Sequence, residues 1–221
     1  MLRADLHVHS MYSFDSANSL DGIIDRCLKT GIDCVAIADH GTIAGGLKLK
    51  EMAPFKVIVA EEVLTPIGEI MGLFLTEEVP SEISAEEAIA RIRAQDGLVC
   101  LPHPFDYMRG INQRCQSIES LVPDVDIMEV FNARSLPFGF SDRKARRFAR
   151  EHGLLCSAGS DAHTLREIGR AYVELPDFNG KEDFRAALAQ GRIVGRRSCP
   201  LVHFLSAFQT LTAGIKKRFA K

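Results

Sequence analysis

The sequence predicts an α/β fold of the barrel type. Short aliphatic and β-branched runs alternate with helical segments along the chain, a pattern typical of βα units around a mostly parallel sheet. Polar side chains follow several of these runs, and the carboxyl ends of barrel strands are where functional groups collect. No linker or low-complexity tract divides the chain. We therefore expect one barrel domain over residues 1–199 and an amphipathic helical tail over residues 200–221.

Strands are expected where aliphatic residues gather, and helices where a capping residue precedes an apolar stripe. Ser19 and Gly31 bound a helix that we expect over residues 20–29, and the capping box Ser84–Glu87 opens another that runs to Gln95. The other predicted helices cover residues 43–51 and 141–152. The predicted strands cover residues 2–8, 34–38, 56–60, 69–75, 98–101, 127–131, 154–158 and 171–175.

Composition is that of an ordinary folded protein. The 221 residues are 46% hydrophobic, enough for a substantial core, and the formal net charge of −2 gives no general attraction to polyanions. The six cysteines form no CxxC pair, so we expect reduced thiols. The first motif starts at Asp5, which leaves no room for a signal peptide, and no apolar run reaches the roughly 18 residues of a membrane span. We expect a cytoplasmic protein without membrane contact.

Histidine and carboxylate residues follow the apolar runs at four separate places. These are DLHVHS at 5–10, ADH at 38–40, LPHP at 101–104 and GSDAH at 159–163. Alternate residues of a strand point to one side, so His7 and His9 share a face, as do Asp161 and His163. Imidazole nitrogen and carboxylate oxygen bind borderline or hard divalent metals. The recurrence predicts a metal-dependent hydrolase.

In this order, the motifs resemble the polymerase and histidinol phosphatase (PHP) family. The resemblance rests on DLHVHS with Ser13 and Asp15 downstream, then ADHGT, Glu62, PHP and GSDAH, and it covers residues 5–163. It implies a distorted (β/α)7 barrel, a site for two or three divalent ions (manganese, iron or zinc), and hydrolysis of phosphate esters.

The resemblance also implies which side chains bind the ions. The first ion would be bound by His7, His9, Glu62 and Asp161. Glu62 would bridge to a second ion, which would also use His103. The third would be bound by Asp15, His40 and His163.

Several carboxylates near these ligands leave alternatives open. Glu69 stands where many relatives carry histidine, so it is either a ligand of the second ion or a solvent-facing strand residue. A carboxylate ligand there would favour manganese or iron over zinc. Glu61 competes with Glu62 for the bridging place, and the family pattern favours Glu62. Asp5 and Asp39 either orient a histidine ring or cap backbone groups.

The expected reaction is attack of metal-activated water on a phosphate monoester, without a serine or cysteine nucleophile. His163 and Asp161 are the catalytic candidates, and either His163 or a metal-bound water would protonate the leaving group. Arg109, Asn132 and Arg134 follow predicted strands, where they could bind the substrate phosphate. For each arginine a surface role is the alternative.

The expected substrate is a nucleotide or a short 5′-phosphorylated oligonucleotide. Histidinol phosphate is an alternative, although the chain is shorter than we expect for that activity. A non-catalytic, metal-stabilised module, such as those attached to polymerases, is a second alternative. Metal-dependent amide hydrolysis would need a carboxylated lysine or an equivalent, which the sequence does not show.

Overall fold

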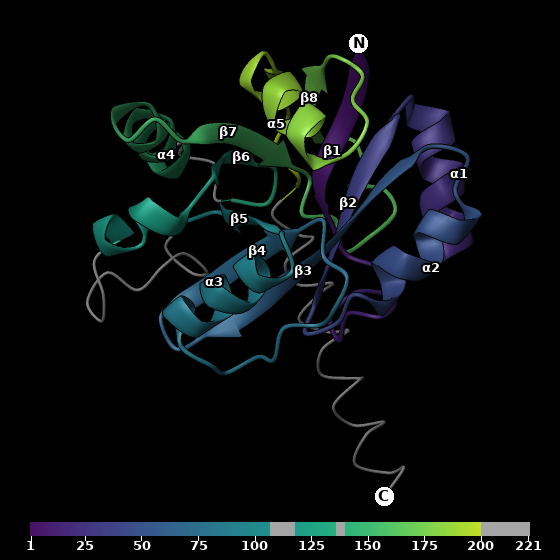
Figure 1. Cartoon of the computed structure of the whole chain (residues 1–221). Helices are drawn as coiled ribbons and strands as arrows, with labels where there is room; N and C mark the ends of the chain where they lie inside the picture. The colour runs from purple at the N-terminus through teal and green to yellow at the C-terminus, as the bar shows by residue number, and fades with distance from the viewer. Residues whose placement is uncertain (107–117, 136–139, 200–221) are drawn as a thin grey trace, which may run out of the picture.

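Seven strands, β1 to β7, follow one another around a barrel in chain order, and β8 and β9 extend the sheet beyond β1 (Figure 1). A computed structural model describes residues 1–106, 118–135 and 140–199. The strands are β1 (Leu2–Val8), β2 (Cys34–His40), β3 (Lys56–Thr65), β4 (Gly68–Leu73), β5 (Leu98–Leu101), β6 (Ile127–Asn132), β7 (Leu155–Gly159), β8 (Ala171–Leu175) and β9 (Arg192–Gly195). The helices are α1 (Leu20–Thr30), α2 (Ala44–Met52), α3 (Ala85–Ala94), α4 (Phe140–Glu151) and α5 (Lys181–Ala189), with 3₁₀ turns at Ile118–Ser120 and Val122–Asp124. The predicted α/β barrel is confirmed.

The barrel closes between β7 and β1 at their carboxyl ends. The Asp161 N–H donates to the His7 carbonyl at 2.7 Å, and the His9 N–H donates to the Ala162 carbonyl at 3.1 Å. Gly159 allows this approach, because a Cβ there would lie 2.2 Å from the Cβ of His7. At the other end, β8 pairs with the first residues of β1 in an antiparallel arrangement, and β9 pairs with β8.

The expectation of a mostly parallel sheet is correct for only two groups of strands. β1, β2 and β3 are parallel, as are β5, β6 and β7. β4 is antiparallel to β3, because the turn between Thr65 and Gly68 is far too short for a crossover, and it is also antiparallel to β5. β3 also continues to Thr65, whereas the sequence analysis predicted that this strand ends at residue 60. Glu62 therefore lies within the strand and not at its end.

A register shift in β1 turns the two histidines of the HxH motif into the barrel. Ala4 and Leu6 pack in the interior, and the pairing of β1 with β2 becomes irregular between Asp5 and Val8. Such a bulge changes the side to which the following residues point. His7 and His9 are fully buried.

Apart from the two 3₁₀ turns, the described elements that the sequence did not predict are α5 and β9. β9 has only four residues, none of them buried, so it lacks the apolar signal of a strand. α5 spans the amino-terminal end of the barrel, where Phe184 joins the interior cluster. Arg185 Nη1 lies 2.9 Å from Asp126, and Lys181 forms an ion pair with Asp96, so α5 is held at the beginnings of β6 and β5.

The predicted capping residues Ser19, Gly31 and Ser84 are confirmed, whereas the Glu87 side chain of the capping box pairs with Arg91. Ser19 Oγ accepts the Gly22 N–H at 3.2 Å, and α1 ends where Gly31 adopts the left-handed φ of 67°. Ser84 Oγ accepts the Glu87 N–H at 3.2 Å at the start of α3.

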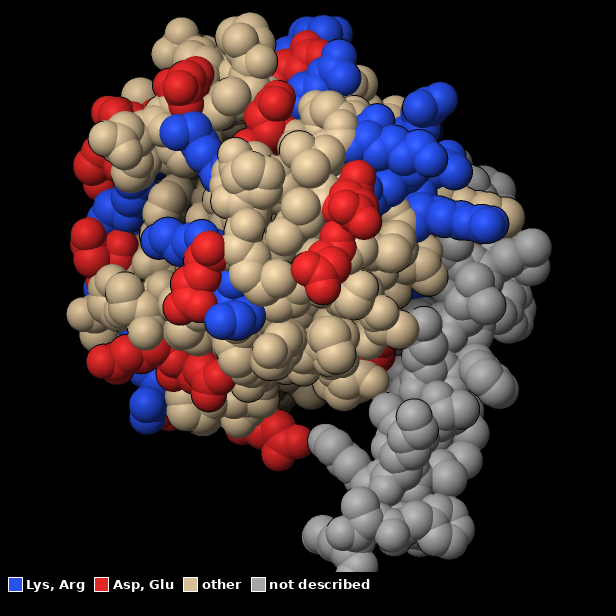
Figure 2. All heavy atoms as spheres, turned by 90° about the vertical axis from the view of Figure 1, so that its right-hand side faces the viewer, with Lys and Arg blue, Asp and Glu red and all other residues tan. Residues whose placement is uncertain are grey.

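The mixed surface charge and the free cysteine thiols agree with what the composition predicted. Figure 2 shows the face covered by α1 and α2, where acidic and basic side chains both occur. Among the described residues no helix is long and apolar enough to cross a bilayer, and a cytoplasmic location stays a prediction. The cysteines in this part of the chain are all free, and Cys27, Cys34 and Cys100 are buried. Cys115 and the tail expected over residues 200–221 lie outside the described residues.

Replacing Gly159 by alanine should open the contact between β7 and β1. The added Cβ must push the two strands apart, and overpacking of this kind costs about 1–3 kcal/mol, occasionally more. We expect a lower free energy of unfolding and weaker Mn²⁺ binding, measured by denaturant titration and calorimetry. Gly153→Ala is the control: its Cβ meets nothing within 4 Å, and only the φ of 68° is strained. Equal metal affinity in the Gly159 variant and wild type would contradict this role of the closure.

Candidate metal centre

Nine metal-binding side chains converge at the end of the barrel where the parallel strands have their carboxyl ends. They are His7, His9, Asp15, His40, Glu62, Glu69, His103, Asp161 and His163. They form four overlapping groups, and within each group the ligand atoms lie within 4.8 Å of one another. The structure thus brings together every residue that the sequence predicted as a metal ligand.

Glu62 lies between two sets of imidazole rings. Its Oε2 is 3.2 Å from His7 Nε2 and 3.3 Å from His9 Nε2. Its Oε1 is 3.0 Å from His103 Nε2. A carboxylate whose two oxygens face different ligand groups has the geometry of a bridge between two ions.

Strand register explains why Glu62 faces the site and Glu61 does not. His40 is the partner of Glu62 in the parallel ladder of β2 and β3, so both point to the same side. Met71 of β4 is also opposite Glu62, and Glu69 is two residues from Met71 and thus on that same side. Glu61 points to the opposite face, where burial raises its pKa to about 7.

Glu69 takes part in the cluster. Its Oε2 lies 3.5 Å from His103 Nε2, and its Oε1 lies 3.8 Å from His40 Nδ1. Its side chain is 16% exposed, so it faces the cluster and not the bulk solvent. The geometry therefore supports the ligand alternative for this residue.

Asp15, His40 and His163 form the outermost group. His163 Nε2 lies 2.8 Å from Asp15 Oδ2, and His40 Nε2 lies 3.4 Å from the same oxygen. His163 Nδ1 donates to the Asp161 carbonyl at 2.9 Å, while burial and the neighbouring His9 lower the pKa of His163 to about 4. A neutral ring with its proton on Nδ1 has a lone pair on Nε2. This lone pair faces a carboxylate oxygen, and a cation between the two would satisfy both.

The innermost group also has the spacing of ligands around one ion. His7 Nε2 and His9 Nε2 are 3.1 Å apart, and Asp161 Oδ1 is 3.4 Å from His9 Nε2. Two nitrogens bound tetrahedrally at zinc-like bond lengths would lie about 3.3 Å apart. Burial lowers the pKa of His7, but the carboxylates of Glu62, Glu129 and Asp161 outweigh it and hold that pKa well above its usual value. The pocket thus favours positive charge, and its donors fit divalent ions.

Glu129 is a site residue that the sequence analysis missed. His7 Nδ1 donates to Glu129 Oε1 at 3.2 Å, while Glu129 Oε2 accepts the His103 N–H at 2.8 Å and the Asn132 amide at 2.9 Å. A carboxylate on the far nitrogen of a metal-binding histidine fixes the ring and its tautomer. The signal in the sequence was an acidic residue within the apolar strand Ile127–Asn132.

Two of the candidate ligands have strained backbones. His103 has a φ of 28° and Asp161 a φ of 53°, in or near the left-handed region that costs about 1–3 kcal/mol for residues other than glycine. The Glu129 carboxylate holds the His103 N–H, and the His7 carbonyl holds the Asp161 N–H. Neighbours of the site therefore impose these conformations.

The residues expected to bind the substrate phosphate lie beside Asp161. The Asn132 amide donates to Asp161 Oδ2 at 3.2 Å, and Arg134 Nη1 donates to the Asp161 carbonyl at 3.4 Å. Arg134 is buried, and its Nε lies 3.6 Å from Glu167 Oε1. Both residues brace Asp161 here, and their roles toward substrate stay predictions. Arg109 lies outside the described residues.

Asp5 and Asp39 brace the loops around the site. Asp39 accepts the N–H and the hydroxyl of Ser10, both at 2.6 Å. Asp5 accepts the N–H groups of Ser160 at 2.8 Å and Gly169 at 2.9 Å. These contacts support the backbone-capping alternative for both residues.

Comparison with known proteins agrees with this geometry. Residues 5–97 match the PHP domain, and residues 140–193 match the PHP-associated region. The uncharacterised protein MJ0417 of Methanocaldococcus jannaschii is 36% identical over 182 residues, which are 80% of this chain and 72% of that protein. The chain belongs to the PHP family. The family assignment made from the sequence motifs is therefore confirmed.

Solved structures share the PHP-type barrel. A two-domain protein of Bacteroides vulgatus, described as containing a PHP-like metal-dependent phosphoesterase, aligns with a TM-score of 0.70 and 16% identity over 88% of this chain. The chain spans 65% of that protein, just under two thirds. PsfC of Pseudomonas syringae aligns with a TM-score of 0.68 and 17% identity, over 96% of this chain and 99% of that one. At these identities the likeness is one of fold.

The Glu129→Gln variant should bind metal more weakly. Glu129 accepts hydrogen bonds on both oxygens, so either orientation of an amide turns its NH₂ group toward a donor. Loss of such a partner weakens metal binding by about 10–100-fold. Competition with a metal-sensitive dye measures the affinity. Glu61→Gln is the control, since that buried side chain faces away from the cluster. Equal affinity in both variants would contradict the role of Glu129.

Divalent ions should stabilise the folded chain. Ligands that bind only the folded state at 100 times their Kd add about 2.7 kcal/mol of stability. We expect Mn²⁺ to raise the Tm of chelator-treated protein, and His9→Ala to reduce this rise. His152→Ala, an exposed position outside the cluster, should keep the full rise. A wild-type Tm that responds to no divalent ion would contradict the metal centre.

Proposed function

We propose that this PHP protein is a phosphoesterase that hydrolyses a phosphate monoester with two or three manganese, iron or zinc ions. The observation that carries the proposal is the position of Glu62, whose two oxygens join the groups around His7 and His103 into one site. Ions bound there would lower the pKa of water and neutralise charge on phosphoryl oxygens. Glu69 adds a carboxylate to the donor set, which supports manganese or iron over zinc.

Asp161 and His163 are our catalytic candidates. Asp161 is held through its N–H by His7, and its side chain lies beside His9 and Asn132. Both ring nitrogens of His163 are engaged, one with the Asp161 carbonyl and the other facing Asp15. These contacts favour a ligand role for His163 over donation of a proton to the leaving group.

The substrate would enter on the side of the outermost ligands. His40, Asp15 and Glu69 have side chains that are 13%, 14% and 16% exposed, whereas those of the inner ligands are nearly inaccessible. Phe14 is 51% exposed and stacks on His40, with ring centroids 5.1 Å apart and an interplanar angle of 27°. A flat ring at the entrance supports a substrate with a planar base, that is, a nucleotide or the end of a short oligonucleotide.

The test is Mn²⁺-dependent phosphate release from a nucleoside 3′,5′-bisphosphate, a 5′-phosphorylated short oligonucleotide and histidinol phosphate. We expect turnover of a nucleotide substrate and its loss in His9→Ala, since that variant lacks a ligand of the inner group. Turnover of histidinol phosphate alone would select the alternative substrate. No release from any substrate, with metal bound stoichiometrically, would contradict the phosphoesterase proposal and favour a non-catalytic module.

Phe14 should contribute to binding of a nucleotide base. Stacking on an aromatic ring is worth about 1–3 kcal/mol per base, so Phe14→Ala should raise KM for the nucleotide at least about fivefold with little change in kcat. Ribose 5-phosphate, which lacks a base, is the control substrate, and its KM should not change. Steady-state kinetics on both substrates measure the difference. An equal change for both would indicate a general effect on the entrance and not base stacking.

A further inference from the structure

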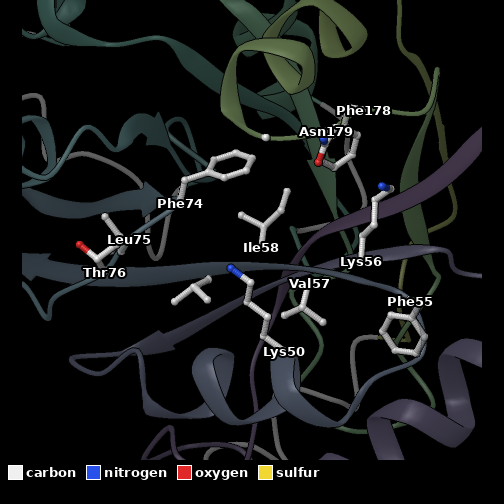
Figure 3. Close-up of a pocket in the computed structure, with 12 residues that line it drawn as sticks. Lys50, Phe55, Lys56, Val57, Ile58, Phe74, Leu75, Thr76, Phe178 and Asn179 are labelled. Atoms are coloured by element: carbon white, nitrogen blue, oxygen red, sulfur yellow. The ribbon is translucent and has the colours of Figure 1, made fainter.

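A separate cavity lies at the amino-terminal end of the barrel, away from the metal centre (Figure 3). Its volume is about 450 Å³, which is in the range of small-molecule sites. It is bounded by the first residues of β3, the residues at the end of β4, and the loop that leads into α5. Ile58 of β3 lines the cavity, and Glu62 of the metal centre is four residues further along the same strand, about 13 Å at strand spacing.

Two aromatic rings form the apolar wall of this cavity. Phe74 and Phe178 both pack on the buried Phe184 of α5, with centroids 5.3 Å and 5.1 Å from its ring. Phe74 has a φ of 61°, a conformation in which a bulky residue is rare. Its ring is only partly buried and faces the same space as Ile58 (Figure 3). Strain of this kind is characteristic of functional sites, and here it presents an aromatic surface to the cavity.

Two lysine side chains line the same space. Lys50 extends from α2 toward the cavity in Figure 3, and among the described residues no ion pair or hydrogen bond engages its ammonium group. Lys56 lines the opposite side, where its Nζ lies 3.1 Å from Asp177 and 5.3 Å from the centre of the Phe178 ring. Gly180, at the amino end of α5, also lines the cavity, whereas the acidic Glu182 and Asp183 of the first turn do not; Asp183 Oδ2 accepts the Asn179 N–H at 3.2 Å.

We propose that this cavity binds a small organic anion. The flat apolar body of the ligand lies against Phe74 and Phe178, and its phosphate or carboxylate group lies near the ammonium group of Lys50. An apolar wall with a few convergent charged groups is the usual form of a small-molecule site. The proposal does not depend on the reaction at the metal centre.

The test is fluorescence titration of the Mn²⁺-loaded full chain with 8-anilinonaphthalene-1-sulfonate, which has an aromatic body and one anionic group. We expect saturable binding that Lys50→Glu weakens at least tenfold. Lys48→Glu is the matched control, because Lys48 is on the same helix but pairs with Glu51 and does not line the cavity. An unchanged Tm shows that each variant is folded.

Competition defines the head group. Phenylphosphonate and benzoate should displace the dye at concentrations at least tenfold lower than benzyl alcohol, which has a ring but no charge. Displacement by only one of the two anions supports the proposal and identifies the group that the cavity prefers. Equal affinity in Lys50→Glu and Lys48→Glu would overturn the proposal. Binding that is instead lost in Phe14→Ala would also overturn it, because the dye would then lie at the metal-site entrance.

Discussion

The contact between β7 and β1 is the constraint on which the rest of the site depends. Strand β1 and the residues directly after β1 and β7 include four of the candidate ligands, and the two segments meet through hydrogen bonds of Asp161 with His7 and of His9 with Ala162. Backbones can approach this closely only because Gly159 has no side chain to meet His7. The same hydrogen bonds hold Asp161 in its left-handed conformation. The contacts that close the barrel therefore also position the ligands.

This arrangement concentrates charge in a space that water barely reaches. Buried carboxylates and imidazoles at hydrogen-bonding distances are costly unless cations compensate them. The pKa of His7 is raised because three carboxylates surround its ring, and His163 presents a lone pair to Asp15. Glu129 adds a carboxylate that orients His7 and supports His103. The charges and donor groups of the site therefore fit divalent ions. The proposed entrance for the substrate lies beside His40.

The two ends of the barrel have different chemistry for a structural reason. At the metal-binding end, strands β1 to β4 and the loops after β1, β5 and β7 bring polar groups to one point. At the amino end, α5 covers the interior with Phe184 and offers its own amino end to a cavity lined by aromatic rings and lysines. The first arrangement suits a cluster of cations, and the second suits an anion with an apolar body.

The sequence by itself determined the α/β class, the helix caps and the family, because these depend on local patterns and on motifs such as DLHVHS. It also named the nine side chains that converge, but it left the role of Glu69 and the choice between Glu61 and Glu62 open. Only the tertiary structure decided which of these side chains face the site and which groups they contact. The register of β3 with β2 turns Glu62 and not Glu61 into the site, and the contact of Glu129 with His7 joins residues far apart in the chain. The antiparallel β4, the short β9 and the bracing roles of Asn132 and Arg134 were equally beyond the sequence. Strand register and barrel closure depend on long-range pairing, which local residue patterns do not record.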